Sequence, residues 1–178
     1  MELFSDRSVV TMMHGIVLGG AALLSSFGAL FAMYVMRPAG RPGVAAASLP
    51  RSVGWLIAGL AALLWLTTLT GTYVVFPPYR ATPPPGVTDL AAYPRAMLLA
   101  HPGTAWLHAF AMESKEHMPW IASMLATAVA FVATRRRLTL QADARLYQTA
   151  MLLLAVCFAL VAFTALLGTR VNKVAPLE

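Results

Sequence analysis

Histidines are the residues with which this apolar chain is best equipped to do chemistry. His108 and His117 flank a charged stretch, "HAFAMESKEHMPW", which runs into an apolar segment without charge until Arg135. His14 lies early in another apolar segment. A neutral imidazole is a common axial ligand of haem iron. We therefore take His14 and His117 as candidate ligands of one b-type haem, with His108 as the substitute ligand if its helix begins early.

The carboxylates beside these histidines have two interpretations. Glu113 and His117 are i and i+4 on one helix, so they share a face, and Glu113 is placed to orient His117 by accepting from its second ring nitrogen. Alternatively, Glu113, Lys115 and Glu116 form a solvated, partly paired charge cluster at the membrane surface. A di-iron centre is disfavoured, because such sites draw carboxylates from several helices and the other apolar segments have none in their interiors.

The surroundings of His14 also have two interpretations. The stretch "HGIVLGG" places Gly15 and Gly19 in G-x-x-x-G spacing, which lets either another helix or a flat ring come close. Relative to the arginines that follow each segment, His14 and His117 differ in depth by roughly 7 Å at 1.5 Å per residue. Each histidine could instead bond simply to a neighbouring helix or a loop carbonyl. The remaining one, His101 in "HPG", is interpreted as a loop residue.

Four apolar segments must position these residues. Of the 178 residues, 59% are hydrophobic and only 11% charged, whereas a soluble domain has roughly a quarter charged. A helix needs about 20 apolar residues to cross a bilayer. The segments that qualify are 9–36, 53–76, 118–134 and 146–169. We expect an all-α integral membrane protein, a single domain over 1–178, folded as an up-down bundle of four transmembrane helices.

Charge asymmetry predicts the orientation of this bundle. One side carries seven arginines and one acid: Arg37, Arg41, Arg51, Arg135, Arg136, Arg137, Arg145 and Asp143. The charges of the other side cancel. Since Lys and Arg in short loops mark the cytoplasmic side, both termini and the long connection should lie outside, periplasmic in a bacterial inner membrane. The net charge of +6 is thus a topology signal and not a nucleic-acid footprint. The acidic start of the chain also argues against a cleaved signal peptide.

The outer connection, 77–117, begins with a proline-rich stretch. Seven of the twelve prolines lie between Pro77 and Gly103, which predicts an extended cover and not another helix. The third transmembrane helix then begins near Met118, or else a longer helix from about Thr104 contains Pro119. Aromatic residues of this connection, Trp106 among them, would be left uncovered without a partner.

A short stretch of similar sequence, here named the internal echo, occurs in both the second and the fourth helix. "LTGTYV" contains Gly71 and "LLGTRV" contains Gly168. Both glycines suit helix C-termini, so the echo is interpreted as convergent capping or as a remnant of duplicated helix pairs.

Two classes of function remain. The first is a subunit of a respiratory or photosynthetic electron-transfer complex, carrying one haem b near the outer leaflet or interacting with quinone or a periplasmic electron carrier. The second is a cofactor-free accessory subunit that stabilises a larger membrane complex through its outer loop. Both classes imply that the partners are lipid and other membrane subunits. Both also favour a non-catalytic subunit of an oxidoreductase complex over an enzyme that acts by itself. The single cysteine, Cys157, permits no internal disulfide, and no C-x-x-C-H haem-attachment motif occurs.

Overall fold

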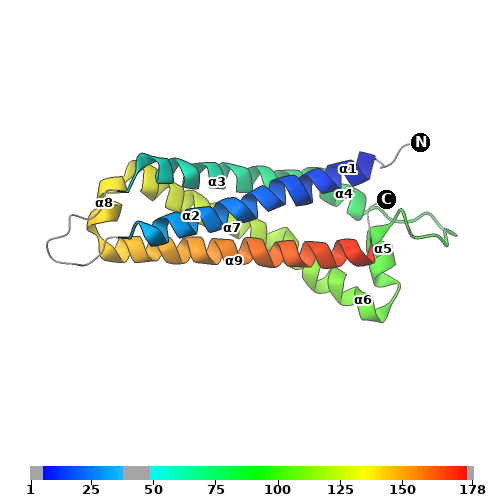
Figure 1. Ribbon diagram of the computed structural model, residues 1–178. Coiled ribbons are helices and arrows are strands. Elements are labelled where there is room, and N and C mark those ends of the chain that lie inside the picture. The colour runs from blue at the N-terminus through cyan, green and yellow to red at the C-terminus, as the bar shows by residue number, and fades with distance from the viewer. Residues whose placement is uncertain (1–5, 38–48, 176–178) are drawn as a thin grey trace.

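Among the residues that the structure describes, four helices are long and apolar enough to cross a membrane. The computed structural model describes residues 6–37 and 49–175, all of whose regular elements are helical. The four candidate spans are Ser8–Val35, Arg51–Tyr79, Pro102–Arg135 and Ala144–Val174. Figure 1 shows them side by side, with the start of α1 (Asp6–Met12) and the end of α9 (Ala144–Val174) at one end of the bundle, here named the terminal end, and α8 (Arg137–Ala142) at the other, here named the α8 end.

The spans are built from consecutive helical elements. The first combines α1 (Asp6–Met12), η1 (Met13–Gly19) and α2 (Gly20–Val35), and the second α3 (Arg51–Thr70), η2 (Gly71–Val75) and α4 (Phe76–Tyr79). The third combines α6 (Pro102–Trp106), η3 (Leu107–Met112) and α7 (Glu113–Arg135); α8 (Arg137–Ala142) links it to α9 (Ala144–Val174), the fourth. The elements η1, η2 and η3 are π-helical, and a short helix, α5 (Pro94–Leu99), lies in the outer connection.

The third span is much longer than the expected 118–134. It begins at Pro102, and Pro119 lies inside α7, so the longer helix is the correct alternative. The outer connection is also not purely extended, because α4, α5 and α6 each have a proline in the first turn. A proline is readily accepted there, since the first amides of a helix have no intrahelical partner. The prolines therefore start short helices instead of preventing them.

Small residues bring the long helices together. α3 packs against α2 and α7, and α9 packs against α2 and α7, so α2 and α7 lie diagonally across the bundle. The core contains Ala22, Ala29, Ala122 and Ala126, each at most 1% exposed. Membrane helices associate through such close backbone contacts, because lipid removes the hydrophobic drive between them.

Polar side chains link α3 to α7 both within this core and at its exposed edge. The hydroxyls of Thr68 and Ser123 lie 3.1 Å apart and are buried, and Trp65 Nε1 donates to Thr127 Oγ1 at 3.0 Å. The ring of Trp65 also meets that of Trp120 edge to face, with centroids 5.7 Å apart. On the other side of α7, Cys157 Sγ of α9 lies 3.5 Å from the Ala122 carbonyl oxygen.

A second hydrophobic cluster closes the terminal end. Tyr79, Leu98, Leu107 and Val171 are buried together, with Phe76 packed against them. The chain thus covers Phe76 and Tyr79 itself, contrary to the expectation that the aromatic residues of the outer connection need a partner. Trp106 remains 51% exposed.

Candidate functional site

The imidazole of His14 is fixed near the terminal end of the bundle. His14 lies in η1 and is half-buried, and its Nδ1 is 3.3 Å from Thr70 Oγ1 of α3. The Thr70 hydroxyl is also 2.8 Å from the carbonyl oxygen of Leu66, one turn earlier in the same helix. A hydroxyl has one hydrogen, which Thr70 donates to that carbonyl, so its oxygen can accept a second bond.

This geometry is compatible with one particular tautomer of His14. With the Thr70 hydrogen directed to Leu66, the contact with His14 is a hydrogen bond only if Nδ1 carries the ring proton. Neutral His14 then has a free lone pair on Nε2. Such a nitrogen can ligate a metal or accept a proton from a bound molecule.

Gly71 makes the close approach to His14 possible. A Cβ at Gly71 would lie 2.9 Å from His14 Cε1 and 3.2 Å from Nε2, closer than real side chains pack. The imidazole edge therefore faces the backbone where α3 passes into η2. Gly71 has helical backbone angles and the helix continues through it, so the expected C-terminal cap is not there.

Lys115 is the second side chain at this site that can carry a positive charge. It lies in α7, is half-buried, and forms no hydrogen bond or ion pair within the described part of the chain. A Cβ at Gly168 of α9 would lie 3.2 Å from its Nζ, so the ammonium rests against the bare backbone of that helix. α9 also contacts η1, the element that contains His14. Gly168 lies within α9 and, like Gly71, ends no helix.

All four spans therefore contribute to one polar site, which we name the His14–Lys115 site. It consists of His14, Thr70, Gly71, Lys115 and Gly168. An unpaired lysine in a membrane helix is costly, and such residues usually have a function. An imidazole lone pair beside an ammonium can take a proton from a hydroxyl and stabilise the resulting oxyanion.

The backbone around this site departs from regular α-helix. The π-helical segments η1, η2 and η3 lie in three different spans, and η1 packs on both α3 and α9 while η3, which continues directly into α7, packs on α9. π-Helical turns occur often at functional sites, because the extra residue redirects side chains. η1 contains His14, and η2 begins at Gly71.

His117 lies elsewhere on α7. Its side chain is exposed, and its Nδ1 is 2.8 Å from the backbone carbonyl oxygen of Glu113. Residues two apart on a helix do not share a face, so a helix that turns Lys115 towards His14 directs His117 elsewhere. No described contact joins His14 to His117. Glu113 does orient His117, but through its carbonyl and not through the expected carboxylate.

The other two histidines are also accounted for. His108 lies in η3, and its Nδ1 is 2.9 Å from the hydroxyl of buried Tyr79. His101 is exposed and caps the N-terminus of α6, which agrees with its interpretation as a connecting residue. Among the described residues, no group of three or more His, Cys, Asp or Glu is arranged to hold a metal ion.

The charged stretch divides between two environments. Glu113 is exposed and Glu116 half-buried, while Lys115 turns into the bundle. No ion pair joins these three within the described structure, so the partly paired cluster is not formed. The G-x-x-x-G contact is likewise absent, since a Cβ at Gly15 would meet nothing within 4 Å and one at Gly19 only the His14 carbonyl.

Lys115 and Thr70 were not predicted from the sequence as members of the site. The internal echo between the second and fourth helices could have indicated this site, because its two glycines, Gly71 and Gly168, face His14 and Lys115. Comparison with protein-family models, curated proteins and solved structures finds no match to this chain.

Proposed function

We propose that this chain is an integral membrane subunit of a respiratory or photosynthetic electron-transfer complex and that its His14–Lys115 site binds a quinol. The single observation that carries the proposal is that the imidazole of His14 and the ammonium of Lys115 each pack against a glycine of another span, Gly71 and Gly168, at the same end of a bundle of apolar helices. A quinol is an apolar ring with hydroxyls that lose protons on oxidation, so it suits a site with a proton acceptor and a cation.

The residues have distinct roles in this proposal. Nε2 of His14 accepts the first proton from a quinol hydroxyl, with Nδ1 held by Thr70. The Lys115 ammonium stabilises the oxyanion that forms. Complete oxidation of one quinol releases two protons and two electrons; the second proton leaves to water, and the electrons pass to a metal centre of a partner subunit. The chain itself is then a subunit of an oxidoreductase complex and not an enzyme alone.

A b-type haem is the other cofactor considered for this chain. His14 fits an axial ligand, because its free Nε2 and its bonded Nδ1 are the arrangement that haem and metal ligands have. His117 does not complete the pair, since it is exposed and no described contact brings it to His14. The quinol site is the function that the geometry supports better.

Absorption spectra and lipid extraction separate these functions. We expect the purified protein to lack a b-type haem spectrum in both oxidised and reduced states, and organic extraction to recover quinone in proportion to protein. A bis-histidine spectrum that disappears in both His14→Ala and His117→Ala would contradict the quinol proposal and establish the haem. Protein with neither haem nor quinone would instead be the accessory subunit.

The orientation of the bundle forms part of the proposal. We propose the up-down topology with both termini and the outer connection periplasmic, because the α8 end carries the arginines and a single acid, Asp143. The His14–Lys115 site then lies near the outer leaflet. Protons released there would enter the periplasm, which suits a complex that builds a proton gradient.

Labelling with a membrane-impermeant thiol reagent tests this orientation. We expect Thr88→Cys, in the outer connection, to be labelled in intact cells, and Thr139→Cys, in α8, to be labelled only after lysis. Both threonines are exposed, and buried Cys157 can be replaced by alanine to remove the native thiol. The reverse pattern would contradict the proposed orientation.

A further inference from the structure

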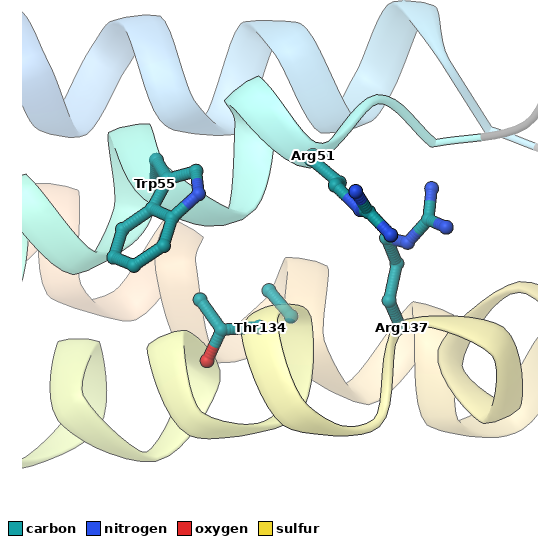
Figure 2. A pocket seen from close by; sticks show the side chains of 5 residues that line it. Arg51, Trp55, Thr134 and Arg137 are labelled. Carbon is teal, nitrogen blue, oxygen red and sulfur yellow. The ribbon is translucent and has the colours of Figure 1, made fainter.

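A cationic pocket opens at the α8 end, far along the bundle from the His14–Lys115 site. It has a volume of about 310 Å³ and is lined by Arg51 and Trp55 of α3, Ala133 and Thr134 of α7, and Arg137 of α8. Figure 2 shows the two arginine side chains on one side of the pocket and the Trp55 indole on the other.

The helices form the wall of this pocket by direct backbone contact. A Cβ at Gly54 would lie 2.9 Å from the carbonyl oxygen of Ala133, so α3 and α7 touch beside the pocket. Arg137 is held in place, because its Nη1 donates to the Leu49 carbonyl at 2.7 Å. The pocket therefore has a fixed side chain on a rigid helix pair.

The positive charge of the pocket has no counterion in the described structure. Arg51 forms no hydrogen bond or ion pair there, and Arg137 bonds only a neutral carbonyl. The sole acid in the sequence near this end, Asp143, caps α9 by accepting from the amides of Arg145 and Leu146. Residues 38–48 contain no Asp or Glu either. The chain near this end therefore offers the two arginines no acidic side chain, which leaves them available to an anion from outside.

The apolar surroundings indicate which anion this is. Trp55 is 71% exposed and Leu138, beside Arg137, is 72% exposed, both at the boundary where an apolar span ends. Tryptophan at this depth belongs to the membrane interface. A free phosphate would use the arginines and leave the indole without a role, whereas a phospholipid would also lay its acyl chains along the apolar surface.

We propose that this pocket binds the phosphodiester headgroup of an anionic phospholipid. Guanidinium groups match the geometry of phosphate oxygens, and basic pockets between membrane helices recognise such headgroups. Arg51 also stands in the first turn of α3, where the helix dipole favours an anion. This proposal is independent of the function of the His14–Lys115 site.

Arg51 provides the cleanest test, because it forms no hydrogen bond or ion pair with the described residues that its removal would break. We expect phosphatidylglycerol, compared with phosphatidylcholine in otherwise identical nanodiscs, to raise the melting midpoint of the wild-type protein by roughly 3 °C. Arg51→Gln should lose this increment, while its melting midpoint in phosphatidylcholine stays unchanged or rises, because a cation leaves a helix N-terminus. Arg135→Gln, an exposed arginine outside the pocket, is the matched control and should keep the increment.

Two results would overturn the proposal. One is an equal melting midpoint of the wild-type protein in the two lipids, a comparison that needs no variant to fold. The other is the same increment in Arg51→Gln as in Arg135→Gln. In a separate experiment, inorganic phosphate is added to the protein in phosphatidylcholine nanodiscs. If phosphate raises the melting midpoint as much as phosphatidylglycerol does, the pocket binds a free anion and the lipid proposal is wrong.

Discussion

Replacing Lys115 by methionine is expected to weaken quinone binding at least tenfold without destabilising the protein. A hydrogen bond to a charged group contributes about 1.5–3 kcal/mol, which corresponds to roughly a 10- to 100-fold change in dissociation constant. Methionine keeps the length and the packing of the aliphatic chain against Gly168. The measurement is a titration of the nanodisc-embedded protein with a short-chain ubiquinone, followed by the quenching of tryptophan fluorescence.

The stability of the same variant separates a functional lysine from a structural one. A half-buried ammonium that has no hydrogen-bond or ion-pair partner among the described residues costs free energy, so Lys115→Met should melt at the same temperature as the wild type or higher. Lys173→Met, an exposed lysine at the same end of the bundle, should bind quinone like the wild type. A Lys115→Met protein that melts lower and still binds quinone normally would show that this lysine serves the fold alone.

Replacing Gly54 by alanine should have the largest effect on stability. The added Cβ would meet the Ala133 carbonyl oxygen at 2.9 Å and its carbon at 3.3 Å, and backbone cannot move aside as a flexible side chain can. Overpacking of this kind costs about 1–3 kcal/mol. Because α3 and α7 form the most extensive contact between helices in the described structure, we expect them to separate locally and the free energy of unfolding to fall.

Gly59 offers a matched control within the same helix. A Cβ there would meet nothing within 4 Å, so Gly59→Ala removes only the conformational freedom of glycine. That change should leave stability unaltered or raise it by up to about 1 kcal/mol. Reversible unfolding in mixed detergent micelles measures both variants. Equal stabilities for Gly54→Ala and Gly59→Ala would contradict the close contact of α3 with α7.

The membrane spans could be predicted from the sequence because hydropathy depends only on composition over a window. The start of the third span could not, since Pro102 and Gly103 resemble a turn as much as a helix N-terminus. Whether a proline stands in a turn or at a helix N-terminus depends on how the segment packs in the folded protein. Here Leu98 of α5 and Leu107, which follows α6, are buried in the second hydrophobic cluster, and this burial stabilises the two short helices.

The candidate site was predicted in part. His14 was found because an ionisable residue in an apolar segment is conspicuous in any sequence. Lys115 was not, because its inward orientation depends on how α7 is rotated, and its neighbours Glu113 and Glu116 suggested a solvated surface. Gly71 and Gly168 looked like helix ends for a similar reason: glycine permits both a cap and a close contact, and only the fold decides between them.

Photolabelling with an azidoquinone in nanodiscs tests the central claim most directly. The account predicts that the label attaches to the peptides that contain His14 and Lys115, and that excess unlabelled quinone displaces it. The two peptides come from spans that lie diagonally across the bundle, so labelling of both locates the ring between them. The opposite result is label that spreads over the exposed apolar faces of α2 and α9 and is not displaced by unlabelled quinone. That result would contradict the proposed quinone site.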